Sequence, residues 1–334
     1  MRKPQDQQLI GESPVFLEVL EHVSRVAPLN RPVLVIGERG TGKELIAARI
    51  HFLSGRWDNP FIKMNCAALA ESLLETELFG HEAGSFTGAA KRRLGRFELA
   101  NDGSLFLDEL SSTSSGVQEK ILRVIEYGEF ERVGGSETIR TNVRIIGATN
   151  EDLPELARQG KFRADLLDRL AFDVITLPPL RERPGDMMTL AEHFAVKMTV
   201  ELGKEIFNGF SEQARDKLMN YEWPGNVREL KNVVERAVYS NQDEDGAVSD
   251  IVFDPFESPW RPGSPGNDAK PPIQSLPDKP YDLKQSIQDE EVRRIKSALE
   301  HCRFNQKKTA EFLGMTYHQL RGYLRKYDLT ETDD

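Results

Sequence analysis

Gly37-Glu38-Arg39-Gly40-Thr41-Gly42-Lys43-Glu44 decides the fold of this chain. The octapeptide follows a short apolar run, residues 32–36, which is typical of a buried parallel strand, and a helical pattern begins at Lys43. Between a strand and a helix, such a loop is a phosphate-binding loop, because its backbone N–H groups surround the phosphates and the lysine adds positive charge. A purely structural glycine-rich turn is the alternative, which the strand, the spacing and the lysine together disfavour. The sequence therefore predicts an α/β P-loop NTPase domain that binds ATP.

A second strand, residues 104–108, completes the predicted site. It is apolar until Asp108 and is followed by Glu109. Asp108 is predicted to hold Mg²⁺, directly or through water, and Glu109 to polarise the attacking water. Alone, such a strand end is a weak signal, but after a phosphate loop it becomes a strong one. Glu44 occupies the position at which a magnesium-binding Ser or Thr usually stands.

The hexapeptide Gly84-Ser85-Phe86-Thr87-Gly88-Ala89 lies between these two halves of the site. Its glycines allow a sharp excursion of the backbone. Phe86 and Thr87 are therefore expected at a loop tip, where no core requires them. An aromatic residue at the tip of a loop connected to an ATP site predicts a contact surface for a partner.

Strand and helix patterns alternate over the first half of the chain. Further strands are predicted at residues 61–65, 142–149 and 172–177, with a helix at 117–126 among those between them, which favours a parallel sheet covered on both faces. The predicted domains are an α/β nucleotide-binding subdomain at 1–180, a helical lid at 181–252, a Pro/Gly-rich linker at 253–282 and a helix-turn-helix domain at 283–334.

Two features mark the boundaries around the predicted lid. Asp186 follows Arg183-Pro184-Gly185 and is a candidate cap for the next helix. Residues 254–280 hold eight of the chain's 18 prolines, which indicates an extended linker.

The C-terminal segment is typical of a helix-turn-helix. We expect Ala310, Phe312 and Leu313 to face a core, Gly314 to make the turn and Thr316 to begin the recognition helix. Residues 293–327 hold nine lysines and arginines against two glutamates, although the whole chain carries a net charge of −10. A helical interaction module with a basic face is the alternative. The predicted DNA contacts are Thr316, Tyr317, His318, Gln319 and Arg321 toward the groove, and Lys307, Lys308, Arg325 and Lys326 toward phosphates.

Composition excludes several other classes of protein. The two cysteines, Cys66 and Cys302, lie far apart and form no disulfide framework, which favours a reduced cytoplasmic setting, here associated with the nucleoid. No apolar run approaches the roughly 20 residues of a membrane span, so no membrane insertion is expected. The six histidines show no metal-ligand spacing.

Taken together, these motifs resemble the AAA+ central domain of bacterial sigma-54-dependent activators, and the resemblance covers residues 9–329. Gly84–Ala89 resembles the family's GAFTGA loop, with Ser85 in place of the usual alanine. The resemblance implies that this loop contacts sigma-54 RNA polymerase and transmits ATP hydrolysis to it. Glu44 is also usual in this family. The C-terminal segment resembles the family's Fis-type domain, which implies binding to double-stranded enhancer DNA.

The resemblance also implies roles for residues that no motif assigns by itself. Asn65 would switch Glu109 on and off, Thr149 and Asn150 would form the sensor I site, and Arg228 would be sensor II on the lid. Taken singly, Asn65 could be a turn residue and Arg228 a structural ion-pair partner.

Residues 162–170 resemble the family's arginine-finger segment. Arg163 and Arg169 would reach the γ-phosphate bound by a neighbouring subunit and stabilise transition-state charge there. The resemblance therefore implies that the working form is a ring, a hexamer. Without it, both would be ordinary surface arginines.

Most members of the family begin with a sensory domain; because the phosphate loop starts about thirty residues after Leu9, we expect no such domain in this sequence. The resemblance is to the phage shock branch of the family, in which a separate protein inhibits the ATPase in trans. Trp57, in a predicted surface loop, is a candidate contact for that inhibitor; a half-buried packing tryptophan is the alternative.

Two other function classes remain as alternatives. One is a DNA-binding regulator of sigma-70 transcription whose AAA+ domain only forms oligomers, and the Gly84–Ala89 loop disfavours it. The other is a DNA-remodelling ATPase such as a helicase loader or clamp loader. ATP-dependent transcription that requires sigma-54 would distinguish a sigma-54 activator from both alternatives.

Overall fold

The computed structural model describes residues 9–86, 89, 91–241, 246–256, 261, 283–327 and 329. The chain divides into two compact units, Met1–Pro255 and Phe256–Asp334. Thr87, Gly88 and most of the predicted linker lie outside the described residues. In the described part of the chain, no helix is both long and apolar enough to cross a bilayer.

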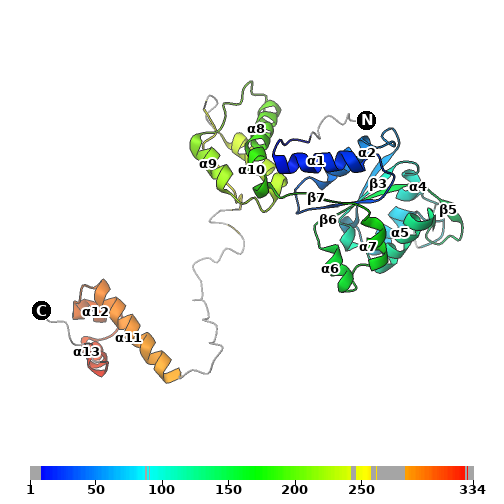
Figure 1. The fold of residues 1–334 in the computed structure, drawn as a ribbon. Helices are drawn as coiled ribbons and strands as arrows, with labels where there is room; N and C mark the ends of the chain where they lie inside the picture. Colours follow the sequence, from blue (N-terminus) through cyan, green and yellow to red (C-terminus); the bar gives the residue numbers. More distant parts are fainter. Residues whose placement is uncertain are drawn as a thin grey trace. The chain divides into compact units, whose positions relative to one another are not determined.

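The first unit is built on a five-stranded parallel sheet with the strand order β2-β3-β6-β1-β7 (Figure 1). The register pairs Asn65 with Asp108 and Ile36 with Thr149, so the carboxyl ends of these strands meet at one edge. All five predicted strands are confirmed. Their bounds are β1 Val33–Ile36, β2 Phe61–Asn65, β3 Ser104–Asp108, β6 Arg144–Thr149 and β7 Val174–Thr176.

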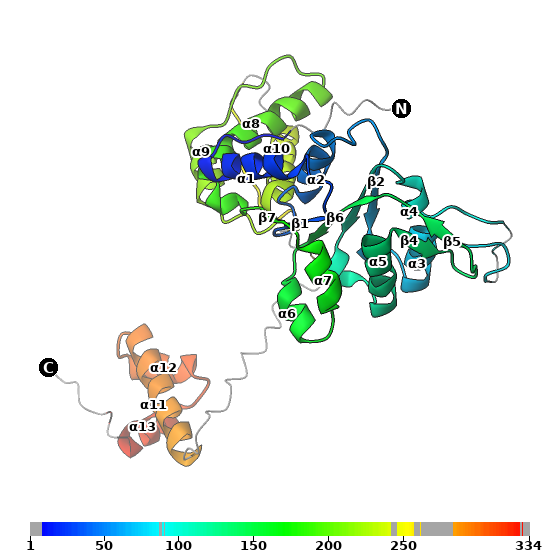
Figure 2. The same ribbon diagram turned by 45° about the vertical axis from the view of Figure 1, so that its right-hand side comes forward.

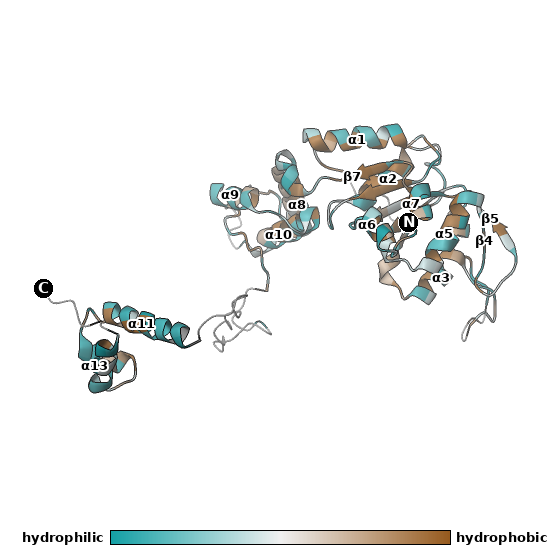
Figure 3. Ribbon diagram, turned by 60° about the horizontal axis from the view of Figure 1, so that its bottom comes forward, coloured by the Kyte–Doolittle hydropathy of each residue, from teal (hydrophilic) through white to brown (hydrophobic). Residues whose placement is uncertain are grey.

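Alternating side chains of the strands enter two separate cores, because successive residues of a strand face opposite sides of the sheet. Leu105 and Leu107 pack in the core covered by α3, α5 and α7, whereas Phe106 packs with α1 and α2 on the other face. The strands are correspondingly the most apolar part of the unit (Figure 3). The helices of this subdomain are α1 Pro14–Val26, α2 Lys43–Phe52, α3 Glu71–Phe79, α4 Arg96–Leu99, α5 Ser115–Tyr127, α6 Leu153–Arg158 and α7 Ala164–Leu170, with 3-10 turns at Cys66–Ala68 and Leu110–Ser112.

A two-stranded antiparallel hairpin stands apart from this sheet and was not predicted. Its strands are β4 Glu129–Glu131 and β5 Thr138–Arg140. The connection between its strands lies beside the residues that precede Gly84, since His81 forms an isolated bridge with Val133 (Figure 2 shows the hairpin). The hairpin therefore supports the loop that the sequence singles out.

The predicted helical lid consists of α8 Pro184–Glu201, α9 Glu212–Asn220 and α10 Asn226–Ser240, after a 3-10 turn at Leu180–Glu182. Its core is closed by Trp223, which is fully buried. The prediction that Asp186 caps a helix is wrong. Arg183 is the N-cap of α8, and Asp186 lies buried within the first turn, where it binds a distant segment.

The second unit contains α11 Leu283–His301, α12 Gln306–Phe312 and α13 Tyr317–Lys326. Gly314 has φ +64° and makes the predicted turn, and Thr316 is the N-cap of α13. Ala310 is buried in the core, with Leu313 packed against it. Phe312 does not face that core as expected; it is 62% exposed and its ring lies 4.9 Å from that of His301.

His51 carries a testable pH dependence of stability. Its buried ring stacks on Phe61, and Nδ1 lies 3.0 Å from the Ser104 hydroxyl. Burial lowers the pKa of His51, so the unfolded chain takes up a proton near pH 6.5 that the folded chain resists. We expect stability to fall as pH drops below that value, by up to about 1.4 kcal/mol per pH unit. Urea unfolding at pH 7.5 and 5.5 measures this loss, which His51→Gln should reduce; an equal loss in both proteins would contradict it.

Candidate functional site

The phosphate-binding loop, Gly37–Glu44, connects the end of β1 to the start of α2. Gly40 and Gly42 have φ of +80° and +99°, which side-chain-bearing residues rarely adopt. A Cβ on Gly40 would also lie 2.2 Å from the carbonyl oxygen of Gly225, at the start of the lid helix α10. Glycine is therefore required here both for the turn and for close approach of the lid.

Lys43, the first residue of α2, is buried beneath the loop. Its Nζ donates to the carbonyl oxygens of Gly37 at 2.8 Å and Glu38 at 3.2 Å. Burial lowers the pKa of Lys43, an effect that the nearby Glu109 and Asp108 carboxylates oppose. The sequence prediction placed this ammonium among phosphates, and the structure places it at the base of the loop that would surround them.

A cavity of about 750 Å³ opens over the loop at the carboxyl edge of the sheet. Asp108 ends β3 and lies across from Asn65, whose Nδ2 is 3.5 Å from an Asp108 carboxylate oxygen. Glu109 follows in a left-handed conformation, with φ +52° and ψ +46°. Such strain in a glutamate at a cavity is typical of functional positions. The cavity-lining residues among those predicted are Arg39, Gly40, Gly42, Lys43, Glu44, Asn65, Asp108, Glu109, Asn150 and Arg228.

Asn65 and Glu44 make contacts at this edge that the sequence did not reveal. The Asn65 amide binds Asp108 and, within the described residues, makes no hydrogen bond to Glu109. The Glu44 carboxylate accepts a hydrogen bond of 2.8 Å from Lys63. The Asn65 switch thus remains a prediction.

The two predicted sensor I residues lie at the end of β6. Thr149 is buried, donates to the Ser111 hydroxyl at 3.1 Å, and its carbonyl accepts from Gly37 N–H. Asn150 lines the cavity, and its buried Oδ1 has no hydrogen-bond partner among the residues that the structure describes. Because a buried polar atom without a partner is costly, this oxygen suits a ligand that donates to it directly or through water.

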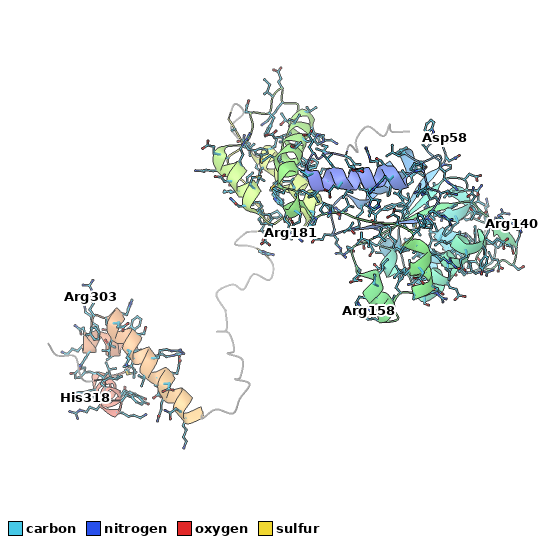
Figure 4. All side chains as sticks on the ribbon, viewed as in Figure 1. Asp58, Arg140, Arg158, Arg181, Arg303 and His318 are labelled. Atoms are coloured by element: carbon cyan, nitrogen blue, oxygen red, sulfur yellow. The ribbon has the colours of Figure 1, made fainter. Side chains whose placement is uncertain are left out.

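The lid is tied to the phosphate loop through Glu38, a connection that the sequence did not reveal. Arg181 donates two hydrogen bonds to Glu38, of 3.0 and 2.6 Å, and the Asn226 amide donates to both Glu38 and the Arg39 carbonyl. Bonding to Arg181, and then to Asn226, lowers the pKa of Glu38 to about 2. Arg181 lies at the junction of the lid and the sheet (Figure 4). Arg228, in the first turn of α10, also approaches Gly40.

Arg169 lies on α7 and Arg163 is the N-cap of that helix. Neither side chain lines the phosphate cavity of its own chain. Arg163 is paired with Asp165 at 2.7 Å and Arg169 with Glu126 at 2.8 Å. The structure therefore brings neither arginine to the site of the same subunit.

The described part of the Gly84–Ala89 loop has an exposed aromatic residue, as expected. Phe86 is 47% exposed, and Gly84 has φ +83°. The loop is closed by a hydrogen bond from Gly84 N–H to the Ala89 carbonyl, and the Ser85 hydroxyl donates to the Glu82 carbonyl at 2.9 Å. Ser85 therefore adds a bond within the turn that an alanine could not make.

A buried arginine beneath this loop was missed by the sequence analysis. Arg132, at the end of β4, donates to the carboxylates of Glu82 and Glu98. These bonds, first that to Glu98, raise the pKa of Arg132 above its ordinary value. The network joins the hairpin to the base of the loop. A single arginine in a polar stretch gave no signal of this burial.

The second unit exposes the side chains predicted to contact DNA: Lys307, Lys308, Thr316, Tyr317, His318, Gln319, Arg321, Arg325 and Lys326. His318 is labelled in Figure 4. Thr316 and Gln319 form a capping box at the start of α13, with the Gln319 side-chain oxygen 2.8 Å from Thr316 N. That oxygen is thus engaged within the helix terminus, which leaves the Gln319 amide nitrogen for other contacts.

A second, smaller cavity of about 410 Å³ adjoins the first. The two share Gly42, Leu45 and Arg228, and the second has apolar side chains from four segments that the sequence analysis did not connect. These side chains are Leu9, Ile10, Phe16, Leu45, Leu190, Phe194 and Val227. The lining also includes polar and charged side chains, among them Arg183, His193 and Lys231, but it is more apolar than that of the first cavity. This contrast suits a nucleotide, whose phosphates are charged and whose base is largely apolar.

The residues present fit ATP and Mg²⁺. Arg39, Lys43 and Arg228 supply positive charge at the polar cavity, and the Asn150 oxygen supplies an acceptor. Among the described residues no group of three or more metal-ligating side chains occurs. A metal bound by Asp108 together with phosphates and water agrees with this, because Mg²⁺ commonly uses one or two carboxylates and substrate phosphates.

Three family models match the chain. The sigma-54 interaction domain matches residues 9–176, the AAA+ ATPase lid domain residues 181–257, and the bacterial regulatory protein, Fis family, residues 286–327. The chain belongs to the sigma-54-dependent transcriptional activators. Its first unit is an AAA+ ATPase with a lid, and its second a Fis-type helix-turn-helix, which confirms the predicted fold class and function.

Similar proteins include members with both short and long chains. The chain is 57% identical over 323 residues to the Psp operon transcriptional activator of Escherichia coli (strain K12), covering 96% of this chain and 98% of that one. It is 45% identical to the Nif-specific regulatory protein of Azotobacter vinelandii over 94% of this chain, but spans only 58% of that protein. The crystal structure of NtrX from Brucella abortus in complex with ATP has a TM-score of 0.69 at 31% identity, covering 96% of this chain and 69% of that one.

Proposed function

We propose that this activator uses ATP hydrolysis to remodel the closed promoter complex of sigma-54 RNA polymerase through the Gly84–Ala89 loop. The supporting observation is that Lys43, Asp108 and Glu109 line one cavity, in the same compact unit as the exposed Phe86. The proposal includes a ring of subunits, a hexamer, and a cytoplasmic, nucleoid-associated protein.

The chemistry follows from the placement of these side chains. Lys43 neutralises phosphate charge from below the loop, and Glu109 accepts a proton from the attacking water. Asp108 holds Mg²⁺, which when bound neutralises charge on the β- and γ-phosphate oxygens. Asn65 contacts Asp108 and can position this pair. Asn150 lines the same cavity, and Thr149, which is buried at the end of β6, precedes it.

Arg163 and Arg169 complete the site from a neighbouring subunit. Both are surface residues held by carboxylates of their own chain, Arg163 by Asp165 and Glu119 and Arg169 by Glu126, from which a bound phosphate can draw them. A lone subunit would then be a weak ATPase. This dependence on a neighbour links hydrolysis to assembly of the ring.

Thr87→Ala should leave ATP hydrolysis intact but remove engagement of sigma-54. Thr87 lies outside the described residues, but it follows Phe86 in a loop remote in sequence from the catalytic side chains. We expect ATPase activity within about twofold of wild type, since no group at the phosphates changes, and loss of stable sigma-54 engagement. ATPase assays beside sigma-54 binding measure the two effects, and wild-type engagement would refute the assigned contact.

The Fis-type unit binds enhancer DNA in this proposal. Its nine exposed candidate side chains lie on or beside α12 and α13. The high identity to the Psp operon activator supports a role in the phage shock response, including inhibition of the ATPase by a separate protein in trans.

Trp57 is the candidate contact for that inhibitor. It is 63% exposed, which disagrees with the half-buried packing alternative, and Phe52 and Leu53 are exposed nearby in sequence. Trp57→Ala should keep its basal ATPase activity and resist inhibition by the purified inhibitor. Unchanged inhibition of this variant would discard the contact.

Co-sedimentation tests ring, site and loop together. The full chain should bind sigma-54 in the presence of an ATP transition-state analogue such as ADP–aluminium fluoride, and not in the presence of ADP. Binding that is equal with both nucleotides would show that the loop does not respond to the hydrolytic site.

A further inference from the structure

The N-terminal segment at residues 9–13 forms a strap that connects the two halves of the first unit. Leu9 packs against the core on the α1–α2 face of the sheet, whereas Ile10 packs against the core of the lid. Both residues also line the smaller, apolar cavity beside the phosphate loop. The position of this strap therefore fixes one wall of that cavity.

One buried carboxylate holds the strap. Asp186 accepts hydrogen bonds from Glu12 N at 2.6 Å, Ser13 N at 2.7 Å and the Ser13 hydroxyl at 2.7 Å. The two backbone N–H groups bind Oδ1, whereas Oδ2 accepts from the Ser13 hydroxyl and also from Arg183 Nε at 2.7 Å. Glu12 and Ser13 lie 174 and 173 positions before Asp186 in the sequence. The bonds join the strap to the first turn of the lid helix α8.

The residues around the bonded carboxylate are buried and closely packed. Asp186 is 0% and Arg183 2% exposed, and the Arg183 guanidinium stacks 3.7 Å above the Phe16 ring. A Cβ on Gly11 would lie within 2.5–2.8 Å of Phe16, Arg183 and Asp186. Phe16 and Arg183 themselves line the smaller cavity. A fully bonded buried ion pair gives geometric precision more reliably than it gives stability.

We propose that Asp186 is a positioning residue for the nucleotide base. It fixes the strap so that Leu9 and Ile10 complete an apolar slot for a purine, and it thereby joins occupancy of that slot to the position of the lid. The proposal rests on the proposed function, because it assumes that ATP phosphates occupy the adjoining cavity. Asp186 touches no part of the nucleotide; it acts through the strap.

Loss of the bonds between Asp186 and the strap should weaken binding of the nucleotide base and leave binding of the phosphates unchanged. Inorganic tripolyphosphate carries the phosphates of ATP without its base, so it probes the phosphate cavity alone. Ser13→Ala removes one hydroxyl bond to Asp186, and Asp186→Asn removes the charge that four donors share. Ser211→Ala is the matched control, since it removes a single hydroxyl bond at the N-cap of α9, in the same lid but away from the strap.

Equilibrium binding of ATP and of tripolyphosphate to the full chain tests the proposal. We expect Ser13→Ala to weaken ATP binding about three- to tenfold, the effect of one hydrogen bond, and Asp186→Asn to weaken it more. Tripolyphosphate binding should stay within about twofold in Ser13→Ala, whose ATPase defect should appear in KM rather than in kcat. Ser211→Ala should bind both ligands as wild type does.

Three results would overturn the proposal. One is an equal loss of ATP and tripolyphosphate affinity in Ser13→Ala, and another is unchanged ATP affinity in this variant. The third is wild-type protein that binds ATP no more tightly than tripolyphosphate. Ser13→Ala keeps the test open even if Asp186→Asn fails to fold. Failure of the proposed function appears differently, as a wild-type chain that binds ATP in this slot without activating sigma-54 polymerase.

Discussion

Glu109→Gln is expected to bind ATP with wild-type affinity and to hydrolyse it about 10²–10⁴-fold more slowly, the usual contribution of a general base. Glu109 follows the end of β3 and lines the phosphate cavity, and its backbone has a strained left-handed conformation. Glutamine keeps the size of the side chain but accepts no proton from water. Single-turnover hydrolysis and equilibrium ATP binding measure the two parts of this expectation.

A surface carboxylate provides the control for this variant. Glu155→Gln changes the same functional group on α6, where Glu155 bonds to Gln159 and does not line the cavity. Its ATPase activity should remain within about twofold of wild type. Normal hydrolysis by Glu109→Gln would show that another group activates the water.

Lys43→Ala is expected to lose ATP binding by at least about 100-fold and to show no measurable turnover. The buried ammonium bonds to two carbonyl oxygens of the phosphate loop, and charge-assisted hydrogen bonds contribute about 1.5–3 kcal/mol each. Two such bonds to phosphate oxygens account for the expected loss. Isothermal titration with ATP and a steady-state ATPase assay measure it.

Stability without nucleotide separates this effect from misfolding. Because burial lowers the pKa of Lys43, the folded protein holds its charge at some cost, so its removal should leave the thermal midpoint of the nucleotide-free protein close to wild type. In saturating ATP, wild type should be stabilised and Lys43→Ala should not. ATP stabilisation equal to wild type in the variant would contradict the role of this lysine.

The main sheet could be predicted because its strands are short apolar runs bounded by glycine, proline or charge. β3 illustrates this: four buried residues precede Asp108, so the end of the apolar pattern locates the catalytic edge. The loop glycines could be predicted for a similar reason, since positive φ and close backbone approach both need glycine.

Features that depend on distant contacts could not be predicted. Asp186 has the local sequence of a helix cap, but the partners that bury it are at Glu12 and Ser13. Phe312 has a helical spacing that suits a core, yet its side chain is mostly exposed and its ring lies against His301. The strands of the β4–β5 hairpin have three residues each and alternate too briefly to give a period.

ATP-dependent open-complex formation by sigma-54 RNA polymerase tests the central claim most directly. A sigma-54 promoter with an upstream enhancer, probed with permanganate, reports strand separation in the presence of the full chain. Melting should require sigma-54 and hydrolysable ATP, and should be absent with Glu109→Gln. Active ATP hydrolysis by the wild-type chain without any promoter melting would contradict the account.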